Sequence, residues 1–191
     1  MRAIRSIVAL LALFALGIAP AMADTEDAAT VALFKNAGQS ADFFSSCYGY
    51  AVFPTIGKGG LVVGAAHGSG HVYAHGKLIG STSMTQLSVG FQLGGQAYSQ
   101  IIFFQDKRSL DEFTSGNFEF DASVSATVIT ASATASAGTT GVDASASGGE
   151  HDAVTAAKYY KGMAVFTVAK GGLMYEATLA GQKFTYTPLR K

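Results

Sequence analysis

The sequence is poor in several residue types, and each shortage argues against a class of structure or function. Cys47 is the only cysteine, so an internal disulfide is excluded. Charged residues make up 14% of the chain, 13 basic and 13 acidic, and this balance does not indicate nucleic acid as a ligand. Tryptophan is absent and aromatic girdles are not obvious, which argues against an outer-membrane β-barrel, the fold that alternating strands behind a signal peptide would otherwise suggest.

A long hydrophobic run is also lacking at the N-terminus. The apolar stretch from Ile7 to Ile18 has about a dozen residues, which is short for a membrane span and argues against a retained anchor. Arg2 and Arg5 precede it, and an Ala-x-Ala pattern ending at Ala23 follows it. These are the parts of a cleavable secretory signal peptide over residues 1–23. We therefore expect an exported, soluble protein of the periplasm or cell envelope with a formal net charge of −2, because cleavage leaves 11 basic and 13 acidic residues.

The first part of the mature chain, residues 24–48, is predicted to be helical. Apolar residues follow helical spacing, a break is expected at Asn36-Ala37-Gly38, and Ser40 is positioned to cap a second short helix. A membrane-binding helix is the alternative, but the flank is acidic, which is the wrong charge for an anionic bilayer. We expect these helices to pack on a sheet through the stripe formed by Val31, Phe34, Ala37 and Ala41.

The rest of the chain, residues 49–191, is predicted to be rich in strands. Alternation is clearest from Thr85 to Leu93, where the odd positions are apolar and are expected to face a core. Glycine turns are predicted at 67–70, 75–76 and 180–181, and a short surface helix at 106–115, in which Ser109 and Glu112 have capping-box spacing. These signals predict an α+β domain, mainly an antiparallel barrel-like or sandwich structure with N-terminal helices. The expected strands span 51–54, 60–66, 71–74, 77–83, 85–93, 98–104, 118–128, 163–169, 173–180 and 183–188.

One segment is built almost entirely of small residues. From Ala122 to Gly148, 22 of 27 residues are Ala, Ser, Thr or Gly. A disordered linker is one interpretation, but alternation continues through the first half. We expect the strand from Phe118 to run through Val128 and a mobile loop to follow to about Asp152. Small inward-facing residues would leave space, either as packing tolerance or as a ligand cavity.

Catalytic and metal-binding patterns are weak. His67, His71 and His75 are four residues apart, but the surrounding glycines argue against a helix, and on one straight strand successive histidines would lie about 13 Å apart. A turn at Ser69-Gly70 would be needed to bring two of them together. No nucleophile motif is present, and Cys47, which has aromatic neighbours and no adjacent basic residue, is expected to be a buried apolar residue. We predict no catalytic activity, no cofactor and no metal site, with a small metal-dependent enzyme as an alternative.

Two Lys-Gly-Gly sequences are the best candidates for ligand binding. Glycines allow successive backbone N–H groups to converge on an anion, and a lysine adds a point charge. The alternative is that both sequences are simply hairpin turns that need glycine. The candidate headgroup-contacting residues are Lys58, Gly59 and Gly60 in the first sequence, and Lys170, Gly171 and Gly172 in the second.

Several blocks of sequence resemble one known family. AVFPTIGKGGLVVGAAHGSG, GGQAYSQIIFF, SGNFEF, AVFTVAKGGLMYEA and GQKFTYTPL occur in this order from residue 51 to residue 189 and resemble the SYLF domain family. That family includes the lipid-binding domain of yeast actin-patch proteins and of plant FYVE-containing proteins, together with secreted bacterial members. The resemblance implies phospholipid binding, with phosphoinositides as ligands of the eukaryotic members. For an exported chain, anionic or other envelope lipids are the expected ligands, and actin or another protein partner is not implied.

Overall fold

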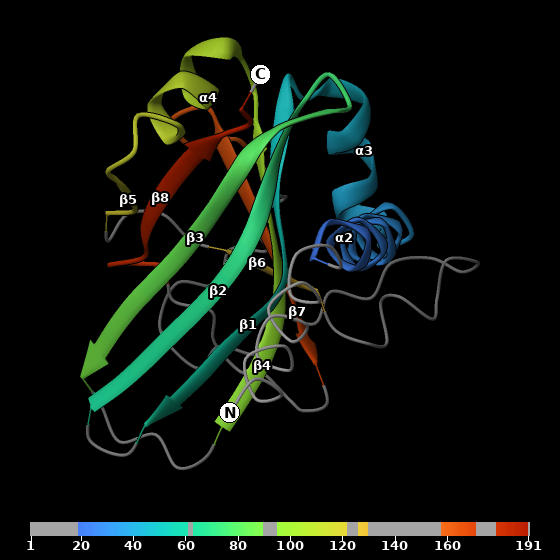
Figure 1. Ribbon diagram of the computed structural model, residues 1–191. Helices are drawn as coiled ribbons and strands as arrows, with labels where there is room; N and C mark the ends of the chain where they lie inside the picture. Colours follow the sequence, from blue (N-terminus) through green and yellow to red (C-terminus); the bar gives the residue numbers. More distant parts are fainter. Residues whose placement is uncertain are drawn as a thin grey trace, which may run out of the picture.

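The computed structural model describes residues 19–60, 63–89, 95–121, 126–129, 158–170 and 179–190. Four long strands form a twisted sheet that curls strongly, with two helices on one face and a short helix near the other (Figure 1). The α+β expectation is confirmed, and the single curled sheet matches the barrel-like form of it rather than a sandwich.

The sheet has eight strands in the order β5-β8-β3-β2-β1-β4-β7-β6. Every pairing is antiparallel except β6 with β7, which is parallel. The helices are α2 (Ala19–Lys35), α3 (Gly38–Ser46) and α4 (Lys107–Phe113). The strands are β1 (Gly49–Gly60), β2 (Val63–Ala74), β3 (Lys77–Val89), β4 (Gly95–Phe104), β5 (Phe118–Glu119), β6 (Thr127–Ile129), β7 (Met163–Lys170) and β8 (Lys183–Pro188).

Two expected interruptions are absent, and both corrections concern β1 and β2. Pro54 does not end β1; the strand continues to Gly60, and the pairing register shifts between Val52 and Thr55. Such an irregularity is a place where a sheet tolerates proline. The predicted turn at residues 67–70 is also wrong, because β2 runs straight through it. A Cβ at Gly68 would lie 2.6 Å from Ile56 Cγ1 and 2.9 Å from the Thr55 carbonyl oxygen, so glycine is required here for close approach and not for turning.

Each face of the sheet carries its own core. The inner face of the curl holds the larger cluster, which includes Phe53, Ile56, Phe104 and Phe184 and is joined by Phe113 of α4. The outer face packs Phe103 and Phe166 against α2 and α3. The predicted strand with four consecutive apolar residues is confirmed, since residues 101–104 of β4 are all fully buried between these two cores.

The two N-terminal helices form as expected, with a break at Asn36 and Ala37. Ser40 does not cap the second helix, however. The N-cap of α3 is Ala37, which has no capping side chain, and the buried Ser40 hydroxyl donates a hydrogen bond to the Phe34 carbonyl, 2.6 Å away. Ser40 therefore gives a second donor to a carbonyl at the end of α2, which also accepts from the Ala37 backbone N–H at 3.3 Å.

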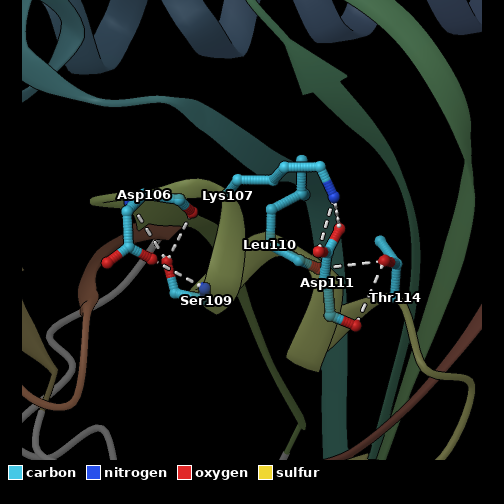
Figure 2. Close-up of polar contacts among 6 residues, drawn as sticks. All are labelled: Asp106, Lys107, Ser109, Leu110, Asp111 and Thr114. Atoms are coloured by element: carbon cyan, nitrogen blue, oxygen red, sulfur yellow. Dashed lines mark hydrogen bonds and ion pairs between the residues drawn. The ribbon is translucent and has the colours of Figure 1, made fainter.

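The short surface helix is confirmed, but its cap differs from the expected one. Asp106 is the N-cap of α4, its carboxylate accepts from the Ser109 backbone N–H at 2.8 Å, and Ser109 Oγ accepts from the Asp106 N–H (Figure 2). This reciprocal pair is a capping box with Ser109 as the third helical residue rather than the cap. The backbone N–H of Ser109 is the main cause that lowers the pKa of Asp106. Leu110 and Phe113 are both buried, as their spacing predicted.

The expected long strand from Phe118 to Val128 is wrong. Its two ends become β5 and β6, which lie at opposite edges of the sheet. Only residues 122–125 separate the described parts of this connection, and five residue steps span at most about 18 Å of extended chain. The curl therefore brings the two edges close together. Residues 173–178 of the strand predicted at 173–180, and most of the small-residue segment, lie outside the described residues.

The alternation at the end of β3 is present but points the other way from our expectation. Leu87 is 74% exposed, whereas Gln86 is only 6% exposed and donates to the Ala180 carbonyl oxygen at 2.9 Å. In the same interior, the side-chain amide of Gln100 donates a hydrogen bond from Nε2 to Oε1 of Gln182, 3.0 Å away. Polar side chains thus enter the curl because they find partners there, and Leu87 is left on the outer face.

Candidate functional site

Lys58 and Lys170, the two lysines predicted to contact a headgroup, lie at the same end of the sheet, where β1 and β7 end. Gly57 pairs with Ala97 of β4, and Ala97 pairs with Lys170, so these three residues form one row across the sheet. Directly paired residues project to the same face and neighbours along a strand alternate. Lys58, one residue after Gly57, therefore projects to the inner face, whereas Lys170 projects to the outer face.

The surroundings of the two lysines differ. Lys170 is exposed, and its ammonium donates to Thr55 Oγ1 at 2.7 Å. Lys58 is half-buried. Gly59 and Gly60 end β1, and Gly60 has a φ of +151°, a conformation that other residues rarely adopt. Gly171 and Gly172 lie outside the described residues. Headgroup contact by these six residues stays a prediction. The strand register places the two lysine side chains on opposite faces of the sheet, so they do not converge on one site.

An exposed leucine lies on the same end of the molecule. Leu87 pairs with Ala65 of β2 and shares the outer face with His67, which pairs with Thr85. We call the set Lys58, Leu87 and Lys170 the strand-end surface. It combines two cationic side chains with one exposed apolar side chain at the sheet end where β1, β3 and β7 stop and β2 and β4 begin.

The histidines do not converge. His67 and His71 project to the same face of the uninterrupted strand β2, and His75 lies in the turn at its far end, with a φ of +48°. Within the described part of the chain, no three His, Cys, Asp or Glu side chains come close enough to hold a metal ion.

A cleft lies on the outer face, between α2 and the strands β1 and β2. Its volume is about 450 Å³, and its walls include Glu26, Asp27, Thr55, His67 and His71. A Cβ at Gly57, which also lines it, would touch no atom within 4 Å, so this part of the floor is open. The hydroxyl of Thr55 that receives Lys170 belongs to the same wall, which brings that lysine to the edge of the cleft.

Asp27 is the most unusual residue of this cleft because it is a carboxylate with only 2% exposure. Its Oδ2 accepts a hydrogen bond from the Tyr73 hydroxyl at 2.7 Å and lies 2.8 Å from His71 Nδ1. The histidine contact is an ion-pair distance without hydrogen-bond alignment, since Nδ1 completes no hydrogen bond. Asp27 Oδ1 is buried and has no hydrogen-bond partner among the residues that the structure describes.

In the sequence, Asp27 stands out only as one of the acidic residues that flank the predicted helix. The structure places it on the buried stripe of α2, together with Thr30 and Phe34. The signal was available in the spacing, because Asp27 precedes Phe34 by seven residues and therefore shares its helix face. A carboxylate at such a position must find partners on the sheet, and Tyr73 and His71 supply them.

Within the described residues, no helix is long and apolar enough to cross a membrane. Cys47 is partly buried, and burial raises the pKa of its thiol, which agrees with the expected apolar character more than with a reactive nucleophile.

Comparison with known proteins identifies the family. The model of the Ysc84 family, described as "Las17-binding protein actin regulator", matches residues 85–187, from the end of β3 through most of β8. "Beta cell expansion factor A" of Aeromonas veronii is similar to this chain, with 31% identity over 165 residues that cover 85% of this chain and 54% of that protein. The chain thus spans about half the length of that relative. On the family match, this chain belongs to the Ysc84, or SYLF, family of lipid-binding-type domains.

Proposed function

We propose that this protein is a non-enzymatic phospholipid-binding protein of the bacterial cell envelope. Family membership supports a lipid-binding-type domain. The observation that carries the proposal to particular residues is the strand-end surface, where Lys58, Lys170 and the exposed Leu87 occupy one end of the sheet. Lysines that share a sheet end with an exposed apolar side chain suit a surface that meets anionic headgroups and the first part of the acyl chains.

The register favours two separate headgroup contacts over one cradle. Lys58 and Lys170 project to opposite faces of the sheet, so one phosphate is poorly placed to receive both ammonium groups. A sheet end that approaches a bilayer edge-on would offer one lysine to a headgroup on each side. The ligands would then be anionic envelope lipids, and the signal peptide predicted over residues 1–23 would export the chain to the compartment where these lipids are met.

Binding to vesicles tests the proposal. Vesicles of a neutral phospholipid with an added anionic phospholipid would be co-sedimented with the purified protein and with Lys58→Ala, Lys170→Ala and the double variant. Each lysine is expected to contribute about 1 kcal/mol near an anionic surface, so each single variant should bind roughly fivefold more weakly. Binding should also fall with added salt, because screening shortens the range of these charges.

Lys77→Ala is the matched control. Lys77 is an exposed lysine at the start of β3, at the opposite end of the sheet from the strand-end surface. If Lys77→Ala weakens vesicle binding as much as Lys58→Ala and Lys170→Ala do, binding follows net charge and the proposed surface is wrong. Absence of wild-type binding to neutral and anionic vesicles alike would contradict phospholipid binding itself.

A further inference from the structure

The cleft beside α2 is lined by a carboxylate, Asp27, of which only one oxygen has a hydrogen-bond partner within the described residues. Tyr73 and His71 both approach Asp27 Oδ2, whereas Oδ1 is buried and receives no hydrogen bond from the described part of the chain. A buried acceptor without a partner costs free energy, and the cost is larger for an ionised group. A donor on a ligand would remove this cost, and a positively charged donor would do so best because its hydrogen bond to a carboxylate is charge-assisted. Glu26, exposed on the same wall, adds a second negative charge.

The other end of the cleft has the opposite character. Lys170 donates to Thr55, which forms part of the wall, and His67 lies in the same row across the sheet as Gly57 and Lys170. The two residues between them in this row are small, Gly57 and Ala97. His67 is exposed and its Nδ1 is 3.2 Å from Thr85 Oγ1. This end can receive an anion.

The two ends are separated along the strands. Thr55, which receives the Lys170 ammonium, pairs with Ser69, and His71 lies two residues further along β2, about 7 Å of strand, whereas His67 lies four residues from His71, about 13 Å. A simple anion would leave Asp27 Oδ1 unpaired and would meet Glu26. A simple cation would leave Lys170 and His67 unused. A ligand with both charges, separated by a short linker, uses both ends.

We propose that this cleft binds a phosphate ester that carries an amine, with the ammonium at Asp27 Oδ1 and Glu26 and the phosphate near Lys170 and His67. The inference rests on the proposed lipid-binding function, because such a group is the head of a zwitterionic phospholipid. The same chemistry occurs in soluble phosphate esters, so the test must separate the two sources.

Calorimetric titration with soluble glycerophosphoethanolamine tests the site directly, and glycerophosphoglycerol, which lacks the amine, is the reference ligand. Wild-type protein should bind the amine ester at least about tenfold more tightly, as expected for a charge-assisted hydrogen bond. Asp27→Asn keeps an acceptor for Tyr73 but removes the charge, and it should abolish this preference. Asp42→Asn, on exposed residue 42 of α3, is the matched control and should behave as wild type.

Two further measurements keep the test decisive if Asp27→Asn does not fold. Glu26→Gln alters an exposed side chain and should reduce the preference for the amine, and the ring resonances of His71 in the wild-type chain should shift on titration with the amine ester. Equal affinity for the two esters, or an unchanged preference in both Asp27→Asn and Glu26→Gln, would overturn the proposal.

The membrane contact and the cleft can fail independently. Lys58→Ala lies on the other face of the sheet and should weaken binding to anionic vesicles without changing affinity for the soluble amine ester. Vesicles that contain phosphatidylethanolamine should compete with the soluble ester if the natural ligand is a lipid. Binding of the ester without such competition would support the site and assign it to a soluble ligand, whereas vesicle binding without ester binding would contradict the cleft and leave the proposed function standing.

Discussion

Single polar side chains connect segments that are distant in the sequence. Tyr73 of β2 binds Asp27 of α2, and Gln182 binds Gln100 of β4 inside the curl. Tyr98 lies beside Gln182 in the same interior, and burial raises the pKa of its phenol to about 12. Each of these residues holds its partners in place because leaving it unpaired would cost more than the bond itself contributes.

The thiol of Cys47 should be a slow nucleophile. Burial raises its pKa, so a smaller fraction is thiolate at any pH below that value, and the thiolate is the reacting form. We expect the folded protein to react with a disulfide reagent at pH 8 more slowly than free cysteine, and the rate should still be rising with pH where free cysteine has levelled off. The protein unfolded in guanidinium is the control and should react at the rate of free cysteine. Equal rates for folded and unfolded protein would show that the thiol is not protected.

At the scale of elements, the long strands depend on glycine for close packing. β2 passes so near β1 at Gly68 that a side chain there would meet Ile56 and the Thr55 carbonyl. This close approach allows the strand to run unbroken from Val63 to Ala74 while the sheet curls. Glycine in a strand usually marks either a bend or the approach of another group, and here it is the second.

Gly68→Ala should therefore destabilise the protein, whereas Gly57→Ala should not. Overfilling a packed site costs about 1–3 kcal/mol. The space around Gly57 is open and its φ is not positive, so alanine there should be neutral or slightly stabilising. Denaturant unfolding of both variants checks this, and equal stability of the two would mean that the approach of β1 to β2 is looser than the structure indicates.

At the scale of the whole molecule, one core joins the sheet, α4 and the β5 edge. Phe184 of β8 contacts the rings of Phe53, Phe113, Phe118 and Phe120. These residues come from four separate segments of the chain. Because all of them pack against the ring of Phe184, these segments should lose their packing together when the protein unfolds.

Phe184→Ala should lower the free energy of unfolding by about 3–5 kcal/mol, the usual range for a large core aromatic residue. Calorimetry should show one transition shifted to lower temperature, since the core is common to all four segments. Leu189→Ala, at a position that is 52% exposed, is the control and should change stability by no more than about 0.5 kcal/mol. Two separate transitions in Phe184→Ala would contradict a single cooperative core.

The local pattern of the chain was enough to predict most elements. Short apolar runs and turn residues identified β4, β7 and β8, and helical spacing identified α2, α3 and α4, because these signals depend on neighbours in the sequence. Family membership was also readable, since ordered blocks of sequence carry it, and the family match now covers residues 85–187.

Tertiary structure alone decided what each position faces. Alternation at the end of β3 predicts two faces but not which one is buried, and Gln86 turned inward because Ala180, distant in the sequence, offers it a carbonyl. The pairing register places Lys58 and Lys170 at the same end of the sheet, but on opposite faces of it. The cleft at Asp27 exists because α2 packs on the outer face of the sheet against β1 and β2, and a contact between residues 27 and 71 arises from long-range packing that no local pattern encodes.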